Sequence, residues 1–185
     1  MTFNKHELLV RATLISALAV RIMEMCLDDV WSGLINACKE LRRVFGDEFV
    51  GLMLFGSFAR CEAGERSDVD VFVVFKTLRG FEVRARAYKA IAKHVDKPLT
   101  LVTTTVDVLT SGDWTSLMVN IGYDGVVACD YDGSLHRFKE RVLGIIRELD
   151  LVRYRTSDGK YGWMRRDGKP IMQPGLSGVQ PSERA

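Results

Sequence analysis

Two hydrophobic runs separated by a polar loop dominate the hydropathy pattern of this chain. The first run covers residues 50–55, and the second covers residues 71–75, whose sequence VFVVF contains only the β-branched and aromatic residues that strands prefer. Between the runs lie a Gly-Ser pair, a short stretch that can begin a helix, and a charged loop at residues 62–66. The segment therefore predicts a strand, a turn with a short helix, a loop and a second strand.

Helical spacing precedes this segment. Between Leu8 and Cys26, apolar residues recur at intervals of four and three, which predicts a helix with one apolar stripe. Packing on its own domain is the more common outcome for such a stripe, and its small alanines favour the alternative, a seam with a second copy or a partner protein. A second helix is predicted from Val30 to Phe45, and Gly46 follows it.

Helices and strands alternate after the second run. This order predicts an α/β (α+β) fold, in which a mixed β-sheet has helices packed on one face. Tyr161, Trp163 and Met164 could form a small hairpin, and the last dozen residues are expected to be disordered. The chain is expected to divide into N-terminal helices, a core and a basic C-terminal extension, at residues 1–46, 47–150 and 151–185. Within the core, helices are expected at 81–95, 107–118 and 135–149, and strands at 98–104 and 125–129.

The net charge of +2 is too small to indicate a nucleic acid partner by itself. Cationic residues do gather on one face of the predicted helix at 81–95 and again after residue 137. A solvated helix face is the common outcome, and a rim that attracts a polyanion is the alternative, so an RNA-binding module remains the weakest of three hypotheses. We expect His94, on the same helix, to be a surface residue rather than a catalyst.

The cysteines and the apolar runs indicate the compartment. Cys26, Cys38, Cys61 and Cys129 are scattered without metal-ligand spacing, so we expect free thiols in a reducing cytoplasm. The apolar run at residues 14–20 is bracketed by arginines, is too short to span a bilayer and has no clean cleavage site after it. The sequence therefore predicts a cytoplasmic protein without a membrane span or a signal peptide.

The candidate chemistry lies between the two hydrophobic runs. Gly56 would let the backbone approach a ligand closely, and Ser57 would add a hydroxyl beside the free N–H groups of a helix start, which suits phosphate. Asp68 and Asp70 are two residues apart, so on a strand their carboxylates share one face. Two such carboxylates repel unless a cation joins them, and carboxylates with phosphate oxygens are the usual ligands of Mg²⁺.

The same residues carry a family resemblance. The segments GSFAR at residues 56–60 and SDVD at residues 67–70 resemble the signature of the nucleotidyltransferase superfamily related to DNA polymerase β, and the minimal nucleotidyltransferases of archaea and bacteria in particular. The resemblance implies that Mg²⁺ and ATP or another NTP bind at Asp68 and Asp70, and that a hydroxyl of an acceptor attacks the α-phosphate. It also implies secondary nucleotide-binding roles for Arg60 and Ser67. Arg60 could equally form a structural ion pair.

The sequence departs from the family pattern at two positions. Family members usually have glycine after the Ala-Arg pair, where this chain has Cys61, and we expect Gly64 to provide the flexible position instead. Family members also usually place a third carboxylate on the next core strand, and the resemblance puts Thr100 at that position. Strand alternation directs Thr100 to one face of the strand, and Leu99 and Leu101 to the other. Asp96 and Asp107, on either side of this strand, could complete the site only by an unusual path of the chain, and Glu62 and Glu65 on the loop are the other candidates.

Two functional hypotheses follow from the resemblance. The first is an active Mg²⁺-dependent nucleotidyltransferase with an unknown acceptor. The second is a degenerate, antitoxin-like member that binds a nucleotide or a partner protein with little turnover, as the threonine at position 100 suggests. The resemblance implies a small helical protein as a possible partner, and the stripe from Leu8 to Cys26 is a possible homodimer surface.

Overall fold

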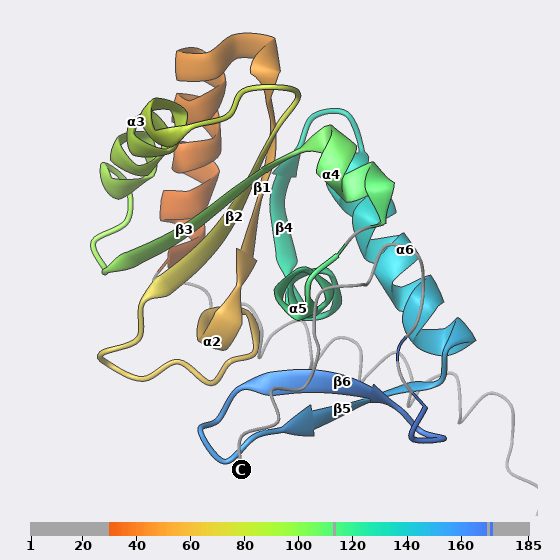
Figure 1. Ribbon diagram of the computed structural model, residues 1–185. Helices are drawn as coiled ribbons and strands as arrows, with labels where there is room; N and C mark the ends of the chain where they lie inside the picture. Colours follow the sequence, from red (N-terminus) through yellow and green to blue (C-terminus); the bar gives the residue numbers. More distant parts are fainter. Residues whose placement is uncertain (1–29, 113, 170, 172–185) are drawn as a thin grey trace, which may run out of the picture.

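The computed structural model describes residues 30–112, 114–169 and 171, and centres on one four-stranded sheet (Figure 1). The predicted helix from Leu8 to Cys26 and the end of the chain lie outside the described residues. The strand order is β3-β2-β1-β4, with β2 and β3 parallel and the other two pairs antiparallel, so the predicted mixed sheet is confirmed. Its strands are β1 (Phe49–Phe55), β2 (Val69–Phe75), β3 (Leu99–Thr105) and β4 (Val126–Asp130).

Helices cover both faces of this sheet, and not one face as the sequence predicted. The helix at residues 30–45 and α3 (Phe81–Ala92) pack on one side, while α4 (Val106–Ser111), α5 (Ser116–Asp124) and α6 (Ser134–Glu148) pack on the other (Figure 1). All seven residues of β1 are buried, as are six of the seven in β2. A strand that is apolar on both faces needs a helical layer on each side, which explains the difference.

Alternation along β2 separates the two hydrophobic layers. Val71 and Val73 pack in the first cluster, under the helix at residues 30–45, whereas Phe72 and Val74 pack in the second, under α5 and α6. Asp70 precedes Phe72 by two residues, so its side chain lies on the α5 and α6 side of the sheet. The sheet therefore directs the acidic residue to a defined face, at the end where β2 begins.

The path of the chain after β3 differs in one detail from the expected single helix at 107–118. The structure has two short helices, α4 and α5, and Gly112 caps α4 with a left-handed φ of +83°. Trp114 is buried after this turn and contacts the ring of Phe138 on α6 edge-on, with ring centroids 5.1 Å apart. Burial of this tryptophan requires the chain to turn there, so one continuous helix does not form.

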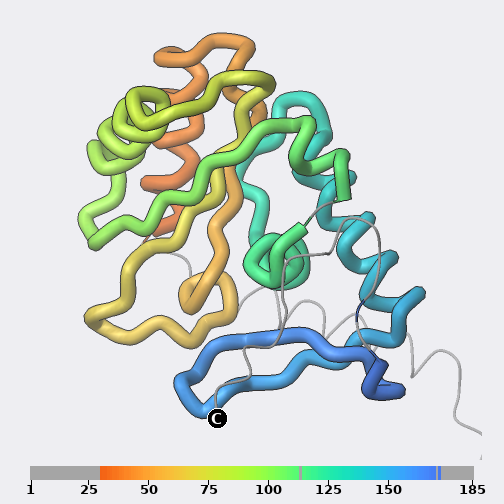
Figure 2. Tube along the Cα trace, in the orientation of Figure 1, coloured from red at the N-terminus to blue at the C-terminus, as the bar shows by residue number. Residues whose placement is uncertain are grey.

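The C-terminal extension contains an antiparallel hairpin, β5 (Leu151–Arg155) and β6 (Tyr161–Arg165), as the aromatic residues there suggested. The tube in Figure 2 follows the hairpin as it passes beneath α5. The Asn120 side chain on α5 donates to the Tyr161 carbonyl at 3.0 Å and accepts from the Trp163 indole N–H at 3.0 Å. These two bonds dock β6 on the core.

A disulfide joins Cys38 to Cys129, so the expectation of free thiols is wrong for this pair. The bridge links the helix at residues 30–45 to β4, and it joins residues 91 positions apart in the sequence with Cα atoms 6.3 Å apart. Such a pairing depends on tertiary proximity, which the spacing of cysteines in the sequence does not reveal. In the described part of the chain, no helix is long and apolar enough to cross a membrane.

Candidate active site

Asp68, Asp70 and Thr100 come together at the end of the sheet where β2 and β3 begin. Asp70 is in register with Thr100 on β3 and with Phe55 on β1. The Thr100 hydroxyl donates to Oδ2 of Asp68 at 3.5 Å, and its strand register places Thr100 opposite Asp70. Thr100, which stands where a third carboxylate was expected in the family, therefore lies beside both Asp68 and Asp70.

Gly56 makes room for the Asp70 side chain. Its φ of +73° is left-handed, a region that L side chains rarely adopt. A Cβ atom at Gly56 would overlap Oδ2 of Asp70 and would lie 2.8 Å from its Cγ. The sequence suggested that this glycine admits a ligand to the backbone. In the structure the group that occupies the space above it is the Asp70 carboxylate.

The surroundings of Asp70 disfavour its negative charge. Partial burial raises the pKa of the Asp70 carboxyl above its usual value, and repulsion from Asp68 raises it further. The positive charge of Arg60 and the hydrogen bond from Thr100 oppose this rise without cancelling it. A cation placed between the two carboxylates would remove the repulsion, which is the electrostatic property expected of a metal site.

The turn after β1 provides the predicted short helix, α2 (Gly56–Ala59). Ser57 lies in it, partly exposed, and its hydroxyl makes no side-chain hydrogen bond with the described residues. Its carbonyl accepts from the Glu62 backbone N–H at 2.8 Å, which turns the chain back on itself. The backbone of Ser57 is thus held in a closed turn, and its hydroxyl is partly exposed.

The loop between α2 and β2 closes differently from the expectation. Cys61 has a left-handed φ of +55°, so this residue itself adopts the conformation for which the family uses glycine. Gly64 does not take over this role; its N–H donates to the Ser67 hydroxyl at 2.9 Å, and its carbonyl accepts from the Ser67 N–H at 3.0 Å. Ser67 therefore shapes the chain just before Asp68.

Arg60 belongs to an ion-pair network at the rim of the site. Its guanidinium contacts Glu62 at 2.9 Å and Asp124 at 3.3 Å. Asp124 also accepts two hydrogen bonds from Arg153 on β5, at 2.8 and 2.5 Å. The structure therefore shows the ion-pair alternative for Arg60, while the positive charge of Arg60 still acts on Asp70.

Tyr161 closes this network from the hairpin. Its hydroxyl donates to Glu62 at 2.9 Å, and the guanidinium groups of Arg60 and Arg153 lie 4.8 and 3.8 Å from its ring centroid. None of Asp124, Arg153 and Tyr161 was predicted as a site residue from the sequence. Tyr161 was predicted only as part of a small hairpin, and nothing in the local sequence marks Asp124 or Arg153 as neighbours of Arg60.

Two of the candidates for a third carboxylate, Glu62 and Asp107, bind other side chains. Glu62 binds Arg60 and Tyr161, and Asp107 binds Arg79 and the Thr105 hydroxyl. Within the described ranges, no group of three or more His, Cys, Asp or Glu side chains is arranged to hold a metal. The acidic part of the site therefore consists of the two aspartates of the SDVD segment.

The mixed sheet and its helices define an α+β domain. A polar site lies at one end of the sheet, where the acidic pair at the start of β2 meets the glycine turn at the end of β1. The family model of polymerase beta nucleotidyltransferases matches residues 39–132, slightly more than half of the 185 residues. The chain belongs to the polymerase beta nucleotidyltransferase family. The family match includes every candidate site residue named above except those of the hairpin.

One similar sequence is a Methanocaldococcus jannaschii protein whose name assigns it provisionally to the protein adenylyltransferases. The two are 40% identical over 55 residues, which is 30% of this chain and 35% of the relative. This chain thus matches about a third of the relative's length.

Similar solved structures include a toxin–antitoxin complex with AMP-PNP, with a TM-score of 0.46, 17% identity, and coverage of 63% of this chain and 89% of the other. Another is a tri-AMPylated Shewanella oneidensis HEPN toxin in complex with an MNT antitoxin, with a TM-score of 0.42, 15% identity, and coverage of 65% and 89%.

Proposed function

We propose that this protein binds a nucleoside triphosphate together with Mg²⁺ at Asp68 and Asp70, and that it transfers the nucleoside monophosphate to a hydroxyl only slowly or with the help of a partner. The observation that carries the proposal is the convergence of Asp68, Asp70 and Thr100 beside the turn that contains Gly56 and Ser57. Family membership supports the nucleotide as substrate.

The residues present fit a magnesium ion. Mg²⁺ is usually held by one or two carboxylates together with substrate phosphate oxygens and waters. Asp68 and Asp70 supply the carboxylates, and the raised pKa of Asp70 indicates a charge that lacks compensation within the protein. When bound, the ion would neutralise charge on the phosphates as the leaving group departs.

The roles of the remaining residues follow from their positions. Ser57 would donate its hydroxyl to a phosphate oxygen, because the closed turn presents it on the side where β1 ends. In the transfer, the acceptor oxygen forms a bond to the α-phosphorus while the bond from the α-phosphorus to the bridging oxygen breaks. Pyrophosphate leaves, and the acceptor proton passes to a base. Ser67 would hold the start of β2, and Arg60 would moderate the charge of Asp70.

The base is the part of this chemistry that the chain supplies least well. Thr100 stands where family members usually carry the third carboxylate, and a neutral hydroxyl accepts a proton poorly. This position favours the second candidate function, a degenerate member that binds nucleotide or a partner with little turnover. Binding should therefore persist in this chain where catalysis is weak.

Two experiments test the proposal. Calorimetric titration with MgATP should show binding to the wild type and none to Asp70→Asn, whereas Asp150→Asn, which removes an exposed carboxylate of the hairpin edge, should bind normally. Ser57→Ala should weaken ATP binding by about 1 kcal/mol, roughly fivefold, and leave AMP binding almost unchanged. Equal MgATP affinity in the wild type and Asp70→Asn would show that the metal assignment is wrong.

Turnover is measured separately, as transfer of labelled AMP from ATP to candidate acceptor proteins together with release of pyrophosphate. We expect slow release from the wild type and faster release from Thr100→Asp, because the new carboxylate would face Asp70 across the parallel strand pair. Brisk turnover by the wild type would show that another group serves as the base.

Several finer properties stay predictions. They are a protein acceptor, a small helical partner, a homodimer through Leu8 to Cys26, and a cytoplasmic location. Because disulfides are uncommon in reducing compartments, the redox state of Cys38 and Cys129 in cells is a direct test of the last of these. Binding to RNA would show as a strong dependence on salt concentration.

A further inference from the structure

β3 forms one edge of the sheet in the described residues, and part of its backbone faces outward. The Pro98 carbonyl accepts from the Val69 N–H at 2.7 Å, so the even-numbered residues of β3 direct their backbone groups toward β2. The odd-numbered residues, Leu99, Leu101 and Thr103, then direct theirs away from the sheet. The Leu101 carbonyl confirms this direction, because it accepts from the Arg84 side chain at 2.8 Å.

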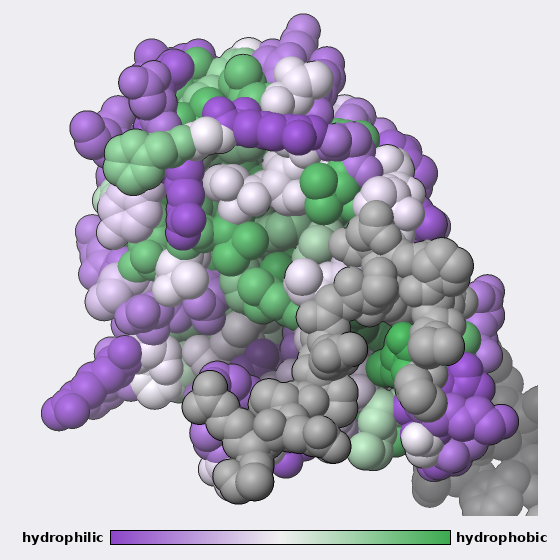
Figure 3. All heavy atoms as spheres, in the orientation of Figure 1, coloured by the Kyte–Doolittle hydropathy of each residue, from purple (hydrophilic) through white to green (hydrophobic). Residues whose placement is uncertain are grey.

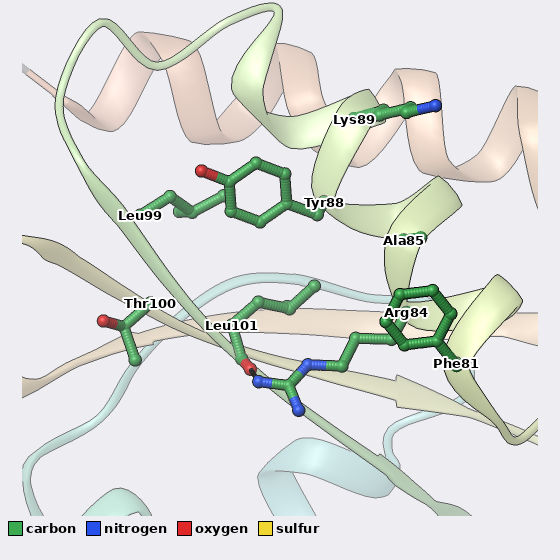
Figure 4. A pocket seen from close by; sticks show the side chains of 8 residues that line it. All are labelled: Phe81, Arg84, Ala85, Tyr88, Lys89, Leu99, Thr100 and Leu101. Carbon is green, nitrogen blue, oxygen red and sulfur yellow. Dashed lines mark hydrogen bonds between the residues drawn. The ribbon is translucent and has the colours of Figure 1, made fainter.

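A hollow of about 460 Å³ lies beside this edge, between β3 and α3. Figure 4 shows Tyr88 and Leu99 toward one end of it and Phe81 with Arg84 toward the other. Phe81 is 85% exposed and Tyr88 is 44% exposed, which is unusual for aromatic rings. Figure 3 shows hydrophobic side chains gathered on this face of the molecule, with hydrophilic ones around them. The hollow is therefore an apolar groove that runs along an open strand edge.

The two charged residues that line the groove are both cationic. Arg84 and Lys89 line it, and no carboxylate among the described residues forms an ion pair with either. Other cations of the same helix are occupied, since Lys93 pairs with Glu40 and Arg86 lies over the Phe45 ring. A ligand of this groove should thus carry negative charge at positions that face α3.

We propose that the β3 edge and the hollow beside it, here named the β3 groove, bind an extended acidic peptide segment of a partner protein as an added strand. The peptide would pair with the outward N–H and C=O groups of Leu99, Leu101 and Thr103. An apolar side chain would enter between Phe81 and Tyr88, and carboxylates two residues before and after it would face Arg84 and Lys89.

The Arg84 contact fits this mode of binding. In the free protein the guanidinium covers the outward carbonyl of Leu101, and covering an edge in this way limits unwanted strand pairing. A peptide carboxylate is a stronger partner for Arg84 than a neutral carbonyl is, so an acidic strand can draw the guanidinium away and free the edge. A peptide without carboxylates cannot do so.

A second copy of this chain is a poor occupant of the β3 groove. Antiparallel pairing of two β3 edges around a two-fold axis would bring two sets of Arg84 and Lys89 together, and like charges in close contact disfavour association. An acidic partner has the opposite, complementary charge. The predicted peptide contacts do not include Asp68 or Asp70, so the variants that test peptide binding differ from those that test nucleotide binding.

The test uses the full chain and a labelled, end-capped heptapeptide, TETLTET. In a strand, its leucine and both glutamates share one face. The first control, TTELETT, has the same composition but places the glutamates on the face opposite the leucine. The second is TETLTET with N-methyl groups on alternate amides, which cannot form the ladder. Fluorescence polarisation measures the affinity, and amide hydrogen exchange reports the pairing.

We expect TETLTET to bind at least about fivefold more tightly than either control, a factor that corresponds to about 1 kcal/mol. Phe81→Ala and Lys89→Glu should each weaken binding by a similar factor. Leu117→Ala, at another exposed apolar residue, and Lys39→Glu, the same charge change on the helix at residues 30–45, should leave it unchanged within about twofold. Exchange should slow at the amides of Leu99, Leu101 and Thr103.

Several results would overturn the proposal. Failure of TETLTET to bind the full chain would do so, as would equal binding of the N-methylated peptide. Equal losses in Lys39→Glu and Lys89→Glu would indicate attraction to the general charge of the protein. A concentration-dependent dimer that Phe81→Ala dissolves, seen in sedimentation, would assign the groove to a second copy of the chain.

Discussion

Replacement of Gly56 by alanine should separate the architecture of the site from the stability of the fold. The added Cβ would overlap the Asp70 carboxylate, which occupies the space above the glycine. Asp70 would have to move away from Thr100 and Asp68, so its contribution to a metal site should be lost. A single methyl group is therefore expected to abolish MgATP binding without removing any proposed ligand.

The cost to stability can be bounded by a matched substitution. Gly56 and Gly46 both have left-handed backbones, with φ of +73° and +57°, but a Cβ at Gly46 would meet nothing within 4 Å. Alanine in that conformation costs about 1–2 kcal/mol, partly offset by the lower entropy of the unfolded chain. Gly46→Ala should therefore lose about 1 kcal/mol of unfolding free energy. Gly56→Ala should lose this amount and a further increment for the displaced carboxylate.

The assays are urea unfolding and calorimetric titration with MgATP on the two variants and the wild type. Gly46→Ala should bind MgATP with wild-type affinity, and Gly56→Ala should not bind it measurably while remaining folded at low urea concentration. Wild-type affinity in folded Gly56→Ala would refute the reasoning, because it would show that the position of the Asp70 carboxylate does not govern the site.

Three further predictions concern single features of the structure. Cys61→Gly should stabilise the fold by up to ~1 kcal/mol in urea unfolding, because φ is +55° at this position, and a loss of stability would contradict the assigned strain. In metal-free buffer, Asp70→Asn should be more stable than the wild type at neutral pH. Because the folded pKa of Asp70 is raised, the folded state holds its proton more tightly. The wild type should therefore lose stability relative to the variant as pH rises from the usual aspartate pKa through the folded pKa; parallel stability curves would contradict this. Reduction of the Cys38–Cys129 bridge should lower the unfolding free energy by about 4 kcal/mol, given the 91-residue separation, and Cys38→Ala should lose its sensitivity to reductant.

The sequence predicted the parts of the fold that local patterns determine. The strands β1 and β2 were evident because their hydrophobic runs are continuous, and the short helix between them followed from the glycine that ends the first run. Strand alternation predicted that Asp68 and Asp70 share one face, and the family resemblance pointed to Thr100 on the next strand. The register of β2 with β3 brings Asp70 and Thr100 opposite each other. Periodicity of two is a property of the backbone, so it can be read without the tertiary structure.

The features that the sequence did not predict all depend on contacts between distant segments. The disulfide requires the helix at residues 30–45 and β4 to meet, and no spacing in the sequence encodes that meeting. Layers on both faces of the sheet were missed although β1 is apolar at every position, a pattern that does indicate burial on two sides. Cys61 was missed because side-chain type alone does not show that a non-glycine residue holds a left-handed φ.

The hairpin network connects these observations to the chemistry of the site. Arg60 is the cation that acts on Asp70, yet Glu62 and Asp124 share its charge, and Asp124 is only 8% exposed. Arg153 brings a second guanidinium to Asp124, so the position of the hairpin affects how strongly Arg60 can stabilise the Asp70 carboxylate. With the positive charge of Arg60 already divided, the protein leaves the Asp68–Asp70 pair under-compensated. This imbalance is the electrostatic basis of our proposal that a divalent cation binds here together with a triphosphate.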